Sequence, residues 1–333
     1  MDSAPSFDVI DRRMLLMAGL GALGVAAWGG CSHQQDAEPK VGDESSAKPK
    51  FTGLIDSHCH LWSGDLQRFP IAPWADKDKM EPASFTAEEL WDTARPHGVD
   101  RVVIVQHSPY FGYDPAYLVD CWRRFPGAFA IVGMIDERQP DLASRLKGLA
   151  EQGVRGIRIS PKLHGDRTPV ADPPNWLNAP RMKDLWTEAT AQHLAICPQI
   201  SPDFLPTLDP MCGQFPDTVC VIDHMGHAGI KSEDDILNLT RLARHPKVYV
   251  KLSAFWTFGA KQPPYADIGP LIRRVYDAFG PKRLMWGSDC PFQLAKGQTY
   301  ADSIELIRTG LDFLTADDRR SILGGTAEQL YFA

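Results

Sequence analysis

From residue 51 onward, short runs of apolar and β-branched residues alternate with longer stretches in which apolar positions recur every three or four residues. The short runs are typical of buried parallel strands, and the longer stretches are typical of amphipathic helices. The predicted strands span residues 54–58, 101–106, 128–134, 154–159, 194–200, 218–223, 248–252 and 283–287. The predicted helices span residues 86–95, 115–124, 142–151, 181–192, 204–215, 234–244, 268–279 and 301–311.

This regular alternation predicts the fold of residues 51–333. Parallel neighbours need a crossover connection, and the helix after each strand supplies it. Eight such units without a second compositional block favour an α/β fold of one closed (β/α)8 TIM barrel. An open doubly wound sheet is the alternative, but no GxGxxG turn follows any predicted strand to support a nucleotide crevice.

The N-terminal residues predict export rather than a folded element. Arg12-Arg13 directly precedes an apolar run that ends near Trp28 and is short for a membrane span. This order is typical of a twin-arginine signal, and Cys31 stands where a bacterial lipoprotein carries its acceptor cysteine, although Trp28 is unusual in a lipobox. We expect a signal over 1–31, a flexible linker over 32–50, and a periplasmic or membrane-tethered protein. An uncleaved membrane anchor is the alternative.

The composition narrows the classes of molecule that the protein is expected to bind. The chain is 44% hydrophobic, which suffices for a large core, and its formal net charge is -7. An acidic chain without a block of lysine and arginine lacks the field that holds a phosphate backbone. We therefore expect a small-molecule substrate and no nucleic acid.

His58 and His60 close the first predicted strand, and Asp289 follows the last one. Residues two apart on a strand point to one face, so the two imidazoles should enter the same space. Two imidazoles and a carboxylate are ligands for a divalent metal such as zinc or manganese. The alternatives are hydrogen-bonded structural histidines, and an Asp289 that caps a following helix.

Other polar residues also follow predicted strands. They are Gln106, His107, Arg158, Ser160, Lys162, Gln199, Asp223, His224, His227, Lys251 and Ser253. Active sites of (β/α)8 barrels lie at the C-terminal ends of the strands, so this common placement predicts a functional pocket.

Four motifs carry a family resemblance. They are Ile-Asp-Ser-His-Cys-His at 55–60, Gly-Val-Arg-Gly-Ile-Arg at 153–158, Val-Ile-Asp-His-Met-Gly at 221–226 and Leu-Met-Trp-Gly-Ser-Asp-Cys-Pro at 284–291. Together they resemble the amidohydrolase superfamily, and most closely its amidohydrolase-related branch, which includes lactonases and, more distantly, nonoxidative decarboxylases. The resemblance implies that His58 and His60 bind the metal. It also implies that Asp289 contacts the metal and moves the proton of the hydrolytic water, and that His224 is the histidine ending the sixth strand.

The chain departs from this pattern at the fifth strand, where Gln199 occupies the position of the usual histidine ligand. An amide oxygen is a poorer zinc ligand than an imidazole. Three outcomes stay open: a more oxygen-tolerant metal such as manganese, hydrolysis without metal, or lost catalysis. We favour retained hydrolysis, with Gln199 binding the substrate or the attacking water.

The resulting hypothesis is a hydrolase that opens a cyclic ester (lactone) or amide. Asp289 acts as general acid/base and His224 polarises the carbonyl. Arg158 suits a carboxylated substrate, unless it forms an interstrand ion pair with a residue such as Asp136, and His107 lines the pocket. The alternatives are a decarboxylase of an aromatic or enolic acid and a non-catalytic binding lipoprotein.

Overall fold

The computed structural model describes residues 53–161, 163–172 and 175–333. The predicted signal, the linker, the lipidation of Cys31 and the predicted pocket residue Lys162 lie outside these residues. Within them, no helix is both long and apolar enough to cross a membrane.

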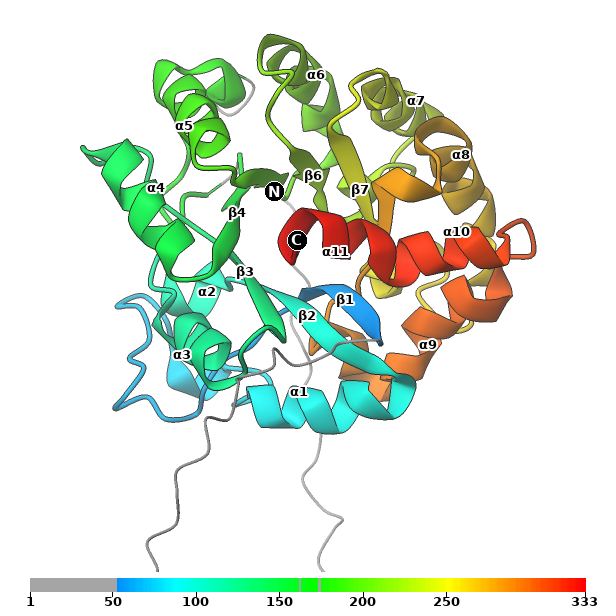
Figure 1. Ribbon diagram of the computed structural model, residues 1–333, viewed down its shortest axis with the longest axis horizontal. Helices are drawn as coiled ribbons and strands as arrows, with labels where there is room; N and C mark the ends of the chain where they lie inside the picture. The colour runs from blue at the N-terminus through cyan, green and yellow to red at the C-terminus, as the bar shows by residue number, and fades with distance from the viewer. Residues whose placement is uncertain (1–52, 162, 173–174) are drawn as a thin grey trace, which may run out of the picture. The chain divides into compact units, whose positions relative to one another are not determined.

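Eight strands form one sheet in sequence order, and each pairs in parallel with the next (Figure 1). They are β1 (Leu54–Cys59), β2 (Val99–Val105), β3 (Phe129–Gly133), β4 (Val154–Ile159), β5 (Ala195–Pro198), β6 (Cys220–Ile222), β7 (Val248–Leu252) and β8 (Leu284–Trp286). The sheet closes just beyond β8, where the backbone N–H of His60 donates to Cys290 O at 2.8 Å. The predicted barrel is therefore confirmed, with a strand at each expected position.

Helices follow the strands, and most of them surround the barrel. They are α1 (Ala87–Ala94), α2 (Ser108–Phe111), α3 (Ala116–Arg124), α4 (Leu142–Glu151), α5 (Pro180–Ala191), α6 (Leu205–Gln214), α7 (Glu233–Arg241), α8 (Gly269–Phe279), α9 (Tyr300–Glu305), α10 (Ala316–Arg320) and α11 (Thr326–Tyr331). Side-chain caps fix several starts; Thr86 begins α1 and Thr299 begins α9 in capping boxes. The predicted helix 301–311 is shorter than expected, because a π-helical turn follows Glu305.

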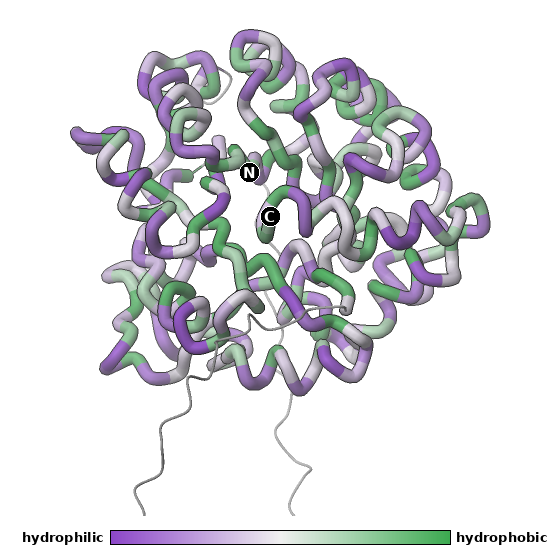
Figure 2. Tube along the Cα trace, viewed as in Figure 1, coloured by the Kyte–Doolittle hydropathy of each residue, from purple (hydrophilic) through white to green (hydrophobic). Residues whose placement is uncertain are grey.

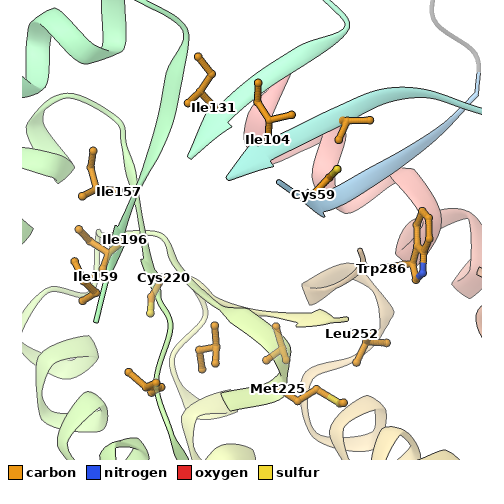
Figure 3. Packing of buried hydrophobic residues seen from close by; sticks show 14 of the residues in the cluster. Cys59, Ile104, Ile131, Ile157, Ile159, Ile196, Cys220, Met225, Leu252 and Trp286 are labelled. Atoms are coloured by element: carbon orange, nitrogen blue, oxygen red, sulfur yellow. The ribbon is translucent and has the colours of Figure 1, made fainter. Parts of the chain in front are cut away.

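Two apolar layers stabilise the barrel. The larger one lies between strands and helices, where Ile104, Ile131 and Ile157 pack (Figure 3). Figure 2 shows mainly hydrophobic positions along the strands and mixed positions along the outer helices. The smaller layer fills the barrel interior and includes Val103 and Tyr331.

Tyr331 belongs to the C-terminal helix α11, which the sequence pattern did not predict. In Figure 1, α11 lies across the centre of the ring of strands. Its side chains Ala327 and Tyr331 belong to the inner apolar layer. Because apolar residues fill that part of the interior, the polar side chains of the barrel gather towards the C-terminal strand ends.

Candidate active site

His58, His60 and Asp289 converge at the point where the barrel closes. His58 Nε2 lies 3.3 Å from His60 Nε2, and Asp289 Oδ1 lies 3.6 Å from each of these nitrogens. All three side chains are buried. The structure therefore brings the three predicted metal ligands together.

An irregularity in β1 turns both imidazoles inward. Ile55 belongs to the inner apolar layer and Cys59 to the outer one, although strict alternation would place them on the same face. The pairing of β1 with β2 shifts between Asp56 and Cys59, which accounts for the change.

Asp56 fixes this end of β1 against the turn after β8. Its carboxylate accepts hydrogen bonds from the Ser288 N–H at 2.8 Å, the His58 N–H at 3.0 Å and the Tyr300 hydroxyl at 2.9 Å. Gly287 permits the close approach, because a Cβ there would lie 2.6 Å from the Cβ of His58. These contacts explain how residues far apart in sequence reach one centre.

Asp289 is not a helix cap. Its backbone has a φ of 61°, and its Oδ2 accepts a hydrogen bond from the Trp256 indole at 2.9 Å. The other carboxylate oxygen, Oδ1, faces the histidines. The indole therefore holds one oxygen and leaves the other directed into the site.

The outer nitrogens of both histidines are already engaged. His60 Nδ1 lies 2.8 Å from Val105 O, to which it can only donate, and His58 Nδ1 lies 3.2 Å from Asp223 Oδ1. Burial lowers the pKa of each imidazole to about 3, so both are neutral near pH 7. The two Nε2 atoms thus offer lone pairs to one another, an arrangement that suits a cation between them.

A buried ion cluster lies behind His58. Lys251 Nζ is 3.1 Å from Asp223 Oδ1 and 3.3 Å from His58 Nδ1, and Arg158 Nη2 is 3.3 Å from Asp223 Oδ2. Burial opposes the ionised form of Asp223, but Lys251, His58 and Arg158 hold its pKa well below the ordinary value. Asp223 therefore stays charged and orients His58.

Arg158 forms a buried ion pair, but its partner is Asp223, after β6, rather than Asp136, the example suggested by the sequence. Asp136 pairs instead with Arg138, whose Nε lies 2.7 Å from its Oδ1. Arg158 also approaches the predicted ligands, because its Nη2 lies 3.4 Å from His58 Nε2.

His224 lies beside the three convergent groups. Its Nδ1 is 2.8 Å from Ser253 Oγ, and its Nε2 is 3.9 Å from Asp289 Oδ1. Burial lowers its pKa well below the usual range, so the ring is neutral.

His107 contributes to an aromatic wall, whereas Gln199 stands apart. The half-buried ring of His107 stacks on Trp62 with a centroid distance of 5.3 Å and lies 5.4 Å from the ring of His60. Gln199 is exposed after β5, and its side chain makes no hydrogen bond to any residue in the described ranges. Gln199 therefore lies outside this cluster, and so does Gln106, whose amide bonds Gly112 O and the Met134 N–H instead.

Comparisons with known proteins agree with this geometry. A model of the amidohydrolase family matches residues 55–333. The chain belongs to the amidohydrolase family. Its hydrolase class therefore follows, while its substrate stays open.

Several proteins similar to this amidohydrolase are named enzymes or have solved structures. L-fucono-1,5-lactonase from Burkholderia ambifaria is 30% identical over 289 residues, which cover 84% of this chain and 96% of that enzyme. The 4-sulfomuconolactone hydrolase of Hydrogenophaga intermedia is 26% identical over 296 residues, covering 84% and 88%. A Burkholderia multivorans amidohydrolase with bound zinc is 25% identical, with a TM-score of 0.69 and coverage of 84% and 99%. A 5-carboxyvanillate decarboxylase from Sphingomonas paucimobilis, at 14% identity and a TM-score of 0.59 over 84% of this chain and 98% of that one, shares the fold alone.

Amidohydrolases generally depend on a metal, and this one has residues that could hold it. The ligand atoms of His58, His60 and Asp289 all lie within 4.8 Å of one another. Their neutral imidazoles and carboxylate are chemically suited to a divalent ion. The site therefore fits a metal through three of the predicted residues.

Two features of this amidohydrolase site were not predicted. The first is the ion pair of Lys251, in β7, with Asp223, the residue after β6. Its one signal in the sequence is a charged residue within the otherwise apolar run of β7. Trp256 was missed, because a tryptophan in a loop carries no sequence signal for a bond to Asp289.

Proposed function

We propose that this amidohydrolase hydrolyses a lactone. The observation that carries the proposal is the free Oδ1 of Asp289, held 3.6 Å from two neutral imidazoles in a buried site. The names of two relatives, a sugar lactonase and a muconolactone hydrolase, support the same reaction class.

Asp289 acts as the general acid/base in this proposal. Its Oδ1 takes a proton from water as the water oxygen attacks the lactone carbonyl carbon. The tetrahedral intermediate then collapses, the ring C–O bond breaks, and the proton passes from Asp289 to the leaving alkoxide. The hydrogen bond from Trp256 to Oδ2 keeps Oδ1 aimed at the reacting water.

His224 stabilises the oxyanion. We assign the proton between His224 and Ser253 to the hydroxyl, so that Ser253 donates to Nδ1 across 2.8 Å. The neutral ring then carries its proton on Nε2, which donates to the carbonyl oxygen as negative charge develops there.

His58, His60 and Asp289 are the proposed ligands of a zinc or manganese ion. A divalent ion at such a site supplies Lewis acidity, which lowers the pKa of water and polarises a carbonyl oxygen. Asp223 and Val105 O keep the ligand nitrogens of the histidines unprotonated. The test is elemental analysis of the full chain beside a His58→Ala, His60→Ala variant. We expect about one equivalent of zinc or manganese in the native protein and none in the variant; a metal-free native protein that gains none on incubation would reject the ligands.

The remaining predicted residues, Arg158, His107 and Gln199, are assigned to substrate binding. Arg158 and His107 flank the convergent groups, and Gln199 follows β5 at the same end of the barrel. We propose that Arg158 and His107 contact the substrate directly. Gln199 has an exposed amide, and in this proposal the amide contacts the outer part of the substrate.

Lactone hydrolysis by the purified chain tests the reaction. We expect ring opening measured by proton release, and Asp289→Asn to lower kcat about 100-fold or more. The matched control is Asp312→Asn at an exposed position, with kcat unchanged. Carbon dioxide release from aromatic or enolic acids, without lactone opening, would overturn the proposal in favour of a decarboxylase.

We also propose twin-arginine export with lipidation at Cys31. The support is the order of Arg12-Arg13, the apolar run and the cysteine in the sequence. Cell fractionation tests it: replacing both arginines by lysine should retain the protein in the cytoplasm, and Cys31→Ser should release it from the membrane. A native protein found only in the cytoplasm would refute both.

A further inference from the structure

His227 is a half-buried imidazole that adjoins the site and has no part in the proposed reaction. Its ring centre lies 5.5 Å from that of His224, to which we assign the carbonyl oxygen. Its face stacks on Phe258 with a centroid distance of 5.9 Å and 10° between the planes. Both histidines follow β6, so they lie at the end of the barrel where the predicted ligands converge.

An unusual turn places both rings. Residues 224–227 all have a left-handed backbone, with φ values of 52°, 51°, 59° and 51°, and only Gly226 among them is a glycine. This conformation is unfavourable for residues with a Cβ, so such a run persists only where the surroundings hold it. Here Met225 is fully buried in the outer apolar layer, and each histidine has a polar contact of its own. The turn therefore keeps the two imidazoles in one fixed arrangement.

These polar contacts give the two rings opposite hydrogen-bonding roles. His227 Nδ1 lies 3.3 Å from Ile200 O, which can only accept, so Nδ1 carries the proton. Burial lowers the pKa of His227, which favours a neutral ring with a lone pair on Nε2. This Nε2 makes no hydrogen bond to any described residue. His224 has the opposite tautomer in the proposed reaction, because Ser253 donates to its Nδ1. One ring thus offers a donor, and its neighbour offers an acceptor.

This donor and acceptor fit two adjoining groups of a lactone. While His224 Nε2 donates to the carbonyl oxygen, a substituent on the next carbon is the group nearest to that oxygen, and a ring 5.5 Å away can contact it. The lone pair of His227 Nε2 accepts from an O–H or N–H group. An alkyl group would cover that lone pair without a partner, and a carboxylate would bring a second acceptor against it.

We infer that His227 Nε2 accepts a hydrogen bond from an O–H or N–H group on the carbon next to the lactone carbonyl. This inference rests on the proposed lactonase activity. It makes His227 a residue that determines specificity through contact with the substrate, separate from the proton transfer by Asp289.

Three lactones of one ring size test the inference on the full chain. They are γ-butyrolactones with a hydroxyl, an acetamido or a methyl group on the carbon next to the carbonyl, and each rate is divided by its uncatalysed rate. We expect kcat/KM for the hydroxyl or the acetamido lactone to exceed that for the methyl lactone at least tenfold, and the better of the two identifies the donor. Equal values, or a preference for the methyl lactone, would overturn the inference and leave the lactonase proposal standing. Failure to open any of the three would overturn both.

His227→Phe tests the residue itself. Phenylalanine keeps a ring that can stack on Phe258 but has no acceptor, so the ratio of kcat/KM for the preferred donor lactone to that for the methyl lactone should fall at least fivefold. His193→Phe is the matched control, because His193 is exposed and has a similar φ of 55°, and it should keep the native ratio. A folded His227→Phe variant with the native ratio would refute the assignment. If that variant does not fold, His227→Gly decides the question: it suits the left-handed backbone and also lacks the acceptor, so it must lower the ratio as well.

Discussion

Lys251→Met removes the ammonium group that neutralises Asp223 inside the barrel. Lys251 is fully buried, with Nζ 3.1 Å from Asp223 Oδ1 and 5.9 Å from the ring centre of Tyr331. Methionine retains much of the side-chain volume, so the change removes a charge more than it opens a cavity. Asp223 would then keep only Arg158 and His58 as favourable neighbours.

The expected loss in the free energy of unfolding follows from the burial of this ion pair. Breaking a buried ion pair by removing one partner costs about 3–5 kcal/mol, because the other charge is left without compensation. Lys247→Met is the matched control just before the same strand. Its ion pair with Asp217 spans 3.2 Å, with side chains 44% and 84% exposed, so we expect a loss below about 1 kcal/mol.

Urea denaturation followed by tryptophan fluorescence and circular dichroism measures both free energies of unfolding. A Lys251→Met loss within about 1 kcal/mol of the Lys247→Met loss would refute the role assigned to the buried cluster. The double variant Asp223→Leu, Lys251→Met separates the two contributions. It should be more stable than Lys251→Met alone, because it contains no uncompensated carboxylate at this position.

Three further changes probe the same site. Trp256→Phe removes the donor to Asp289 Oδ2, so kcat should fall about tenfold with KM nearly unchanged, and an equal change in both would contradict a positioning role. Burial raises the pKa of Asp56 from 3.8 to about 6, so its stabilising contribution is complete below 3.8 and is lost as pH rises through 6. Relative to Asp56→Asn, the free energy of unfolding should fall by about 2.5 kcal/mol between pH 4 and pH 8, and a pH-independent difference would refute this. Arg158→Met removes a cation 3.4 Å from His58 Nε2 and should tighten zinc binding about tenfold in a chelator competition, whereas weaker binding would show that Arg158 supports the metal site.

The barrel and its ligand triplet could be predicted because each depends on a local pattern. His58 and His60 share a face through their spacing, and Asp289 follows the last strand, so closure of the barrel brings them together. The inward turn of both histidines also requires the irregular pairing after Asp56, which no spacing rule contains.

The interactions around the triplet depend on geometry across the barrel. Lys251 reaches Asp223 because β6 and β7 pair in one particular register, and Trp256 reaches Asp289 through the turn after β7. Helix α11 was missed because it is short, and its role comes from Tyr331 entering the barrel interior. Such contacts arise from three-dimensional packing rather than from any periodic signal.

The two carboxylates of the site can serve different purposes because their surroundings differ. Asp223 contacts Lys251, Arg158 and His58, and these neighbours keep it ionised. Asp289 receives one neutral indole hydrogen bond on Oδ2, and its Oδ1 faces uncharged imidazoles. A carboxylate that two cations stabilise is a poor proton acceptor, whereas one with a free oxygen beside neutral groups can take up a proton and return it. The environment therefore selects Asp289 for proton transfer and leaves Asp223 to orient His58.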